Sequence, residues 1–113
     1  MNIFTEYRKG IMFLRIDGSL DKVTYRKLEE EINILINNCG VNNIVINLEE
    51  VSKIDMKGIS TLYLIYECIK KLKGSIYIYL GCNELKNILK NYRVFNYMDL
   101  IDSELRAFDL VRI

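Results

Sequence analysis

A short apolar run, Ile44 to Leu48, contains no charged residue and is followed directly by two glutamates. A run of this length without charge is typical of a strand that is buried on both faces of a sheet. The stretches on either side of it, residues 21–40 and 58–73, instead repeat their apolar residues every three or four positions, which is the period of a helix. A strand between two helices predicts crossover connections, and therefore a sheet that is at least partly parallel.

The first twenty residues predict a hairpin. Residues 3–7 and 11–16 read as two strands, and the turn between them is Arg8-Lys9-Gly10, in which Gly10 can adopt a positive φ. In the helix that follows, Asp21 is placed to cap the start and Gly40 to end it. Its predicted buried stripe consists of Tyr25, Leu28, Ile32, Leu35 and Cys39.

The C-terminal half repeats the alternation of strand and helix. Residues 75–80 predict a strand, and Asn83 and Ser103 are good caps for two further short helices. In the second of these helices Leu105 is predicted to face inward. The sequence therefore predicts a single α/β domain over residues 1–113, a mixed sheet with helices packed on it. The predicted order is β-β-α-β-α-β-α with a last short helix.

The charge balance argues against nucleic acid and membranes as partners. The 16 basic and 15 acidic residues leave a net charge of +1, which provides no long-range field to attract phosphate or anionic lipid. No apolar run approaches the roughly 18 residues that a membrane span needs, and the N-terminus lacks the pattern of a signal peptide. We therefore expect a cytoplasmic protein that binds neither nucleic acid nor a membrane.

The residue inventory also argues against an enzyme. Histidine, the commonest general base and zinc ligand, is absent, and so are the glycine-rich nucleotide-binding motifs. We expect no catalytic residue, no metal and no cofactor. The three cysteines, Cys39, Cys68 and Cys82, are widely spaced and predict reduced thiols that are buried as small hydrophobic side chains.

The stretch VSKIDMKGISTLYL, Val51 to Leu64, marks the start of the second helix. Asp55 is placed to cap this helix by accepting hydrogen bonds from its free N–H groups. Lys57 is unexpected there, because a helix N-terminus carries a partial positive charge and disfavours cations. The position of Lys57 therefore requires an explanation from function.

The order and spacing of these segments resemble the STAS domain of bacterial anti-sigma factor antagonists. The resemblance rests on IDGSLD after the second strand and NIVINLEEVSKIDMKGI at the third, and it covers nearly the whole chain. The matching residues are Gly18, Leu20 and Asp21, then Ile44 to Glu50, then Ile54, Asp55, Gly58 and Ile59. It implies a small mixed sheet with helices, and a function in partner switching on an anti-sigma factor with a serine-kinase fold.

In the resembling family, phosphorylation of the second serine in D-S-S-G ends partner binding by adding negative charge. This sequence has Met56 and Lys57 in place of the two serines, so the acceptor hydroxyl is missing. Three interpretations stay open: an antagonist that cannot be switched off, a domain that pairs Lys57 with an acidic group of another partner, or drift with Lys57 pointing into water. Ser60 is a weak alternative acceptor on the solvent side, whereas Thr61 lies nearer the core.

The resemblance also implies a partner-binding surface around the start of the second helix. The predicted core stripe of this helix consists of Leu62, Ile65, Ile69 and Leu72. Beside it, Ile59, Tyr63, Tyr66 and Lys70 form a second stripe that either contacts a partner or packs under a neighbouring segment. The predicted partner-binding residues are Asp21, Asp55, Met56, Lys57, Gly58, Ile59 and Tyr63. An alternative function is a component of a scaffold or sensory assembly that binds another protein, or binds itself as a homo-oligomer, through Phe4, Met12 and Phe13.

Overall fold

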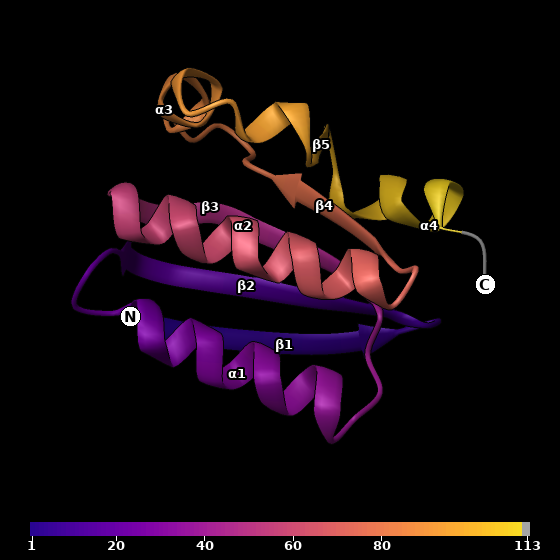
Figure 1. Cartoon of the computed structure of the whole chain (residues 1–113). Coiled ribbons are helices and arrows are strands. Elements are labelled where there is room, and N and C mark those ends of the chain that lie inside the picture. Colours follow the sequence, from indigo (N-terminus) through magenta and orange to yellow (C-terminus); the bar gives the residue numbers. More distant parts are fainter. Residues whose placement is uncertain (112–113) are drawn as a thin grey trace.

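The backbone forms one five-stranded sheet in the order β1-β2-β3-β4-β5 (Figure 1). In this computed structural model, which describes residues 1–111, β1 is antiparallel to β2 and every other neighbouring pair is parallel. The predicted mixed sheet and crossover connections are confirmed. The strands are β1 Asn2–Arg8, β2 Ile11–Leu20, β3 Asn43–Ile54, β4 Ser75–Tyr79 and β5 Asp99–Ile101.

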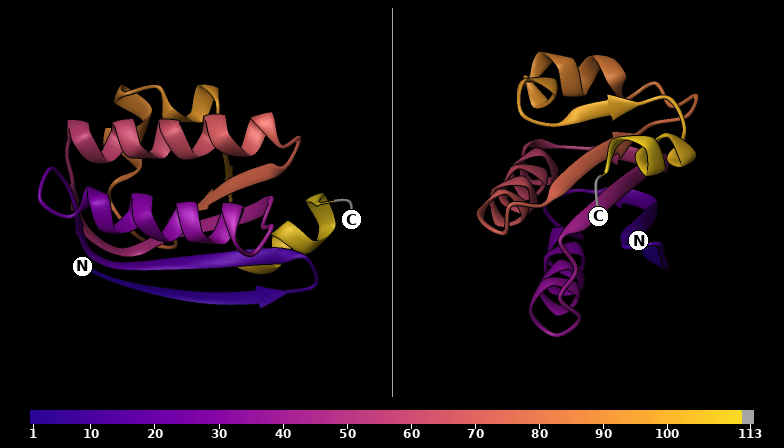
Figure 2. Two further views of the ribbon diagram at one scale, coloured as in Figure 1. Left: turned by 60° about the horizontal axis from the view of Figure 1, so that its bottom comes forward. Right: turned by 90° about the vertical axis from the view of Figure 1, so that its right-hand side faces the viewer.

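The helices connect the parallel strands or end the chain. The two long helices are α1 Tyr25–Asn37 and α2 Met56–Lys71, and both lie on the same face of the sheet (Figure 2). The shorter elements are α3 Lys86–Asn91, the 3₁₀ helix η1 Val94–Asn96, the 3₁₀ helix η2 Glu104–Arg106 and α4 Ala107–Leu110. The strand β5 was not predicted, because three residues are too few to show an alternating pattern.

The hairpin β1–β2 turns on two residues with positive φ, Lys9 at 50° and Gly10 at 83°. Two such residues between paired strands match the right-handed twist of the sheet, which explains the tight connection. Arg8 was predicted in the turn but pairs with Ile11 as the last residue of β1. The register then runs without a shift from Arg8 back to Asn2.

The main core lies between the sheet and the helices α1 and α2. Leu14 and Ile16 of β2 and Ile44 and Ile46 of β3 are almost completely buried there. They meet the apolar stripes of the two helices, which the sequence predicted in large part. The buried stripe residues are Leu28, Ile32 and Leu35 of α1 and Leu62, Ile65 and Ile69 of α2.

The other face of the sheet carries a smaller core. Ile11, Phe13 and Val45 pack there against Ala107 and Val111 of the C-terminal segment. Two residues predicted to support contacts between copies, Met12 and Phe13, are buried within the protein, whereas Phe4 of the edge strand is 57% exposed. Leu105 was predicted to face inward but is exposed, since the chain forms only a short 3₁₀ turn there.

The prediction of buried cysteines is wrong, because all three thiols are exposed. Cys39 follows the end of α1 at Asn37, so the helical period that placed it in the stripe does not reach it. Cys68 lies one residue before the buried Ile69, a rotation of about 100° toward solvent. Cys82 lies in the loop after β4. Leu72 was also predicted in the stripe of α2, but the helix ends before it and it is exposed.

Candidate functional site

Two loops meet where the parallel strands β2 and β3 end, and we call this region the loop site. The last residues of the two strands, Leu20 and Ile54, are neighbours in the sheet. Two hydrogen bonds then join the loops directly, from Asp55 N to Leu20 O at 3.4 Å and from Lys22 N to Asp55 Oδ2 at 3.1 Å. Lys22 and Asp55 are 33 residues apart in the sequence, so these contacts bring together the segments IDGSLD and IDMKGI.

Asp55 caps α2, as the sequence predicts. Its Oδ1 accepts a hydrogen bond from Gly58 N at 2.9 Å, while its Oδ2 accepts the one from Lys22 N. These bonds stabilise the carboxylate, and the bond from Gly58 is the main reason that the pKa of Asp55 lies below its ordinary value. Both carboxylate oxygens therefore bind backbone N–H groups of this protein.

Asp21 shapes the loop before α1 rather than capping the helix itself. Its Oδ1 accepts hydrogen bonds from Val23 N at 3.0 Å and Thr24 N at 3.2 Å, and Thr24 is the N-cap residue. The side chain of Asp21 is almost buried, and the bond from Val23 is the largest contribution that lowers its pKa. The predicted cap is thus displaced by three residues, since a tight turn precedes the first helical residue, Tyr25.

Gly58 allows the two loops to approach each other closely. A Cβ atom at this position would collide with the carbonyl oxygen of Leu20 and lie 2.7 Å from Cγ1 of Ile54. Any side chain would therefore push the start of α2 away from the end of β2. The absence of a side chain at Gly58 therefore permits the close contact between the two loops.

Lys57 does not extend freely into solvent. Its Nζ lies 4.4 Å from the centre of the Tyr25 ring, a cation–π contact between the first turn of α2 and the start of α1. Within residues 1–111 no ion pair holds this ammonium group. Two apolar side chains of the same loops are strongly exposed, Val23 at 80% and Met56 at 60%. The loop site therefore combines an accessible cation with apolar surface.

The other predicted site residues divide between surface and interior. Tyr63 is exposed and its ring packs edge-on against Tyr97 with the centroids 5.1 Å apart, and Tyr66 packs against the same ring. The second stripe of α2 is therefore partly covered by the segment after η1. Ile59 is buried, so its side chain supports the loop site from inside and offers no contact to a partner.

The two hydroxyls of the first turn of α2 lie as the sequence predicts. Ser60 is exposed and Thr61 is buried. Both hydroxyls donate to carbonyl oxygens of the preceding turn, Ser60 to Met56 O and Thr61 to Lys57 O, each at 3.0 Å. Ser60 Oγ is accessible, and its modification stays a prediction.

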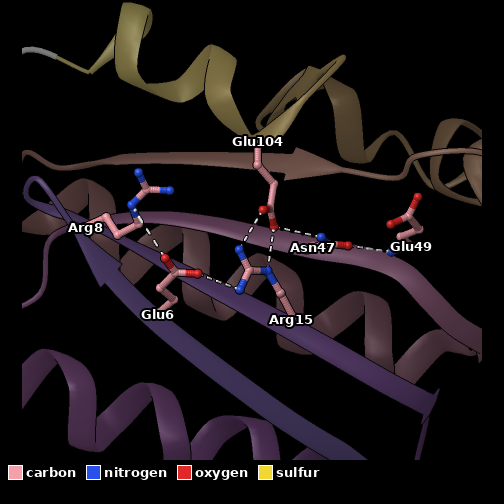
Figure 3. A network of polar contacts seen from close by, with 6 residues as sticks. All are labelled: Glu6, Arg8, Arg15, Asn47, Glu49 and Glu104. Carbon is pink, nitrogen blue, oxygen red and sulfur yellow. Dashed lines mark hydrogen bonds and ion pairs between the residues drawn. The ribbon is translucent and has the colours of Figure 1, made fainter.

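A second polar cluster lies on the face of the sheet opposite α1 and α2, and the sequence analysis missed it (Figure 3). Arg15 of β2 donates to Glu104 through Nε at 3.0 Å and Nη2 at 2.8 Å, and to Glu6 through Nη1 at 2.9 Å. Asn47 donates to the same Glu104 carboxylate at 2.8 Å. We call these four residues the Arg15 network. An arginine and an asparagine inside otherwise apolar strands were the signal that could have revealed it.

The surface of the loop site is formed by a cation and apolar side chains. Its two carboxylates are hydrogen-bonded to backbone N–H groups, which leaves the cation of Lys57 and the exposed apolar side chains on its surface. Among residues 1–111, no group of three His, Cys, Asp or Glu side chains is placed to hold a metal ion. In the same part of the chain, none of the helices has the length and hydropathy of a membrane span.

Comparisons with known proteins agree with this architecture. The family model described as the STAS domain matches residues 2–107. A proposed anti-sigma factor antagonist from Thermotoga maritima has 16% sequence identity and a TM-score of 0.89, over 98% of this chain and 95% of that chain. An anti-sigma factor antagonist from Mycobacterium paratuberculosis has 20% identity and a TM-score of 0.85, over 99% and 94%. The cell fate determinant SpoIIAA of Bacillus, solved in its phosphorylated form, has 19% identity and a TM-score of 0.74, over 98% and 100%. At these identities the structural likeness concerns the fold.

Proposed function

Because this chain belongs to the STAS domain family, we propose that it is a non-catalytic regulatory module that binds an anti-sigma factor or a related protein with a serine-kinase fold. The observation that carries the proposal is the construction of the loop site. Asp21, Asp55 and Gly58 hold two loops in a fixed arrangement through backbone contacts. This arrangement leaves Val23, Met56 and Lys57 exposed together on one surface.

The proposed module lacks the regulatory switch of its relatives. The position of the acceptor serine in the resembling family is occupied by Lys57, which has no hydroxyl to accept a phosphoryl group. Its charge is also opposite to that of a phosphate, so it does not imitate the modified state. The Bacillus relative is described in a phosphorylated form, whereas this chain would stay permanently able to bind.

The charges at the loop site indicate the chemistry of the partner surface. Asp55 directs both of its oxygens toward backbone N–H groups, while Asp21 binds backbone N–H groups through Oδ1 and pairs with Lys53 through Oδ2 at 3.8 Å. The charges that extend outward are therefore those of Lys22 and Lys57. A partner that fits this surface would present carboxylates around an apolar patch. This pairing with an acidic group is the second interpretation of Lys57, and it is compatible with the first.

A binding measurement with the anti-sigma factor encoded nearest to its gene tests the proposal. We expect a complex on gel filtration and by calorimetry, with and without ATP. Lys57→Glu should weaken the complex at least about tenfold, which corresponds to 1.4 kcal/mol, because it opposes like charges across the contact. Lys71→Glu, a matched change at the far end of α2, should leave the affinity unchanged.

Two outcomes would contradict the proposal. If no complex forms at micromolar concentrations under either nucleotide condition, the chain does not act as an antagonist of that protein. If Lys57→Glu and Lys71→Glu weaken binding equally, the contact is elsewhere. Lys57→Ser adds a direct test of the missing switch, because the serine variant should accept phosphate from a cognate kinase with ATP while the natural chain should not.

A further inference from the structure

We infer that the free edge of β1 is a binding surface for a second copy of this chain, which would join the two sheets by antiparallel pairing of β1 with β1. The inference concerns a surface other than the loop site and does not depend on the proposed function. β1 is the terminal strand of the sheet, and it pairs with β2 on one side only. In the part of the chain that the structure describes, the backbone N–H and C=O groups on the other side of β1 therefore have no neighbouring strand of the sheet to pair with.

The register of the hairpin identifies which backbone groups point outward. Because a two-residue turn follows Arg8, the pair Arg8 and Ile11 exchanges hydrogen bonds, and such pairs recur at every second residue. The N–H and C=O groups of Ile3, Thr5 and Tyr7 consequently face away from β2. No hydrogen bond within residues 1–111 connects these groups to another element. They form the template for an added strand.

β1 lacks the features that usually protect an edge strand. It has seven residues in unbroken register, with no proline and no bulge in its pairing with β2. Its acidic residue, Glu6, is neutralised within the molecule by Arg15 at 2.9 Å and Arg8 at 3.5 Å (Figure 3). It therefore offers little charge repulsion to an approaching strand. By contrast, the opposite edge strand β5 has only three residues and has Asp99 and Asp102 at or beside its ends.

Apolar side chains lie next to this edge on both faces of the sheet. Phe4 projects on the same face as Arg15, its neighbour in β2, and remains 57% exposed. On the helical face Tyr7 is also exposed. The Nζ of Lys27 in α1 donates a hydrogen bond to Met1 O at 2.6 Å, so Lys27 is on the side of the helix nearest β1. Ile34 lies seven residues further along α1 and therefore on the same side of the helix, and it is 47% exposed.

The sequence of β1 is complementary to itself when the two-fold axis passes between the two copies of Phe4. In that register the outward groups of Ile3 face those of Thr5 in the second copy, Phe4 meets Phe4, and Asn2 lies opposite Glu6. Aromatic pairs and amide–carboxylate pairs directly across two strands are favourable. The register centred on Glu6 would instead place Phe4 opposite Arg8, so the aromatic pair would be lost. This self-complementarity favours a second copy over an unrelated strand.

Sedimentation velocity under reducing conditions tests the inference on the full chain. The natural protein should show a concentration-dependent species of twice the monomer mass. Thr5→Pro removes an outward N–H that β2 does not use, and it should weaken the dimer at least about tenfold. Phe4→Lys should act in the same direction if the proline variant fails to fold. Leu100→Lys, a matched change on the opposite edge strand, should leave the dimer unchanged.

The register has its own test in a background with the three exposed cysteines replaced by serine. Phe4→Cys should form an intermolecular disulfide with oxidised glutathione, because the side chains of this pair lie closest across the axis. A crosslink through Thr5→Cys instead would overturn this register. A natural protein that remains monomeric at every accessible concentration would overturn the whole inference. Lys57→Glu should dimerise like the natural chain, so a failure of anti-sigma binding and a failure of dimerisation are separate results.

Discussion

The loop site and the Arg15 network use their charged groups in opposite ways. At the loop site, Asp21 and Asp55 accept hydrogen bonds from backbone N–H groups, and their role is to fix the path of two loops. In the Arg15 network, Glu6 and Glu104 accept from the side chain of an arginine, and their role is to join strands β1 and β2 to the C-terminal segment. Among residues 1–111, the first arrangement leaves Lys22 and Lys57 without an ion pair, whereas in the second the charged groups pair with one another.

This difference explains why the loop site is conspicuous in the sequence while the Arg15 network, which is equally polar, is not. Backbone-directed contacts act over two or three residues, so they leave a short motif. The contact between Arg15 and Glu104 spans 89 residues and leaves no local pattern. The same difference determines how each region should respond to substitution, pH and charge changes.

The largest effect is expected when the close contact between the two loops is broken. Gly58→Val would place side-chain atoms against the carbonyl of Leu20, and it should lower the free energy of unfolding by about 1–3 kcal/mol. Urea titration measures the change. Ser60→Val, an exposed change of similar size in the same turn, is the control. Equal stability of both variants would show that the approach of the loops is not tight.

A smaller effect is expected in the Arg15 network. Arg15→Met leaves Glu104 and Glu6 without their shared donor and should lower the free energy of unfolding by about 1 kcal/mol, because partial exposure screens these ion pairs. A double-mutant cycle with Glu104→Gln should give a positive coupling energy. Additive effects would mean that the bidentate contact contributes nothing to stability.

Acid should weaken both regions. Hydrogen bonds from Arg15 lower the pKa of Glu104, and bonds from backbone N–H groups lower the pKa of Asp21 and Asp55. A carboxyl group with a lowered folded-state pKa stabilises the protein above its unfolded pKa, so stability should fall as the pH drops below about 5. Stability curves of Glu104→Gln and Asp55→Asn should each be flatter in this range. If stability depends on pH as steeply in one of these variants as in the natural protein, the substituted carboxyl group does not contribute to the loss of stability in acid.

The smallest effect on stability is expected at Lys57. Lys57→Ala loses the cation–π contact with Tyr25 but also removes a cation from a helix N-terminus, so the two changes should nearly cancel. We expect a change within about 0.5 kcal/mol by thermal or urea unfolding. A much larger loss would mean that Lys57 is a structural residue of the loop site and not one left free for a partner.

The sequence predicted those parts of the fold that have a local physical cause. The two long helices and the central strand follow from the spacing of apolar residues, and the cap at Asp55 follows from its place before a helix. The start of α1 was predicted less well, because a turn through Thr24 separates Asp21 from the helix. The burial of Ile59 could not be inferred, since it depends on how α2 tilts onto the sheet.

Errors arose where periodicity was extended beyond the end of an element. Cys39 and Leu72 continue the apolar stripes in the sequence, but the helices end before them. The edge strand β5 and the Arg15 network were missed because both depend on contacts with distant segments. The contact of Lys57 with Tyr25 required the relative placement of two helices, which no spacing in a single sequence provides.

The three accessible thiols at positions 39, 68 and 82 have a practical consequence for handling the molecule. Air oxidation can link copies at random through any of them, and a gel without reductant would then show ladders that imitate specific assembly. The same thiols are also useful, because one retained at a time gives an attachment point for a spectroscopic label in a separate part of the fold.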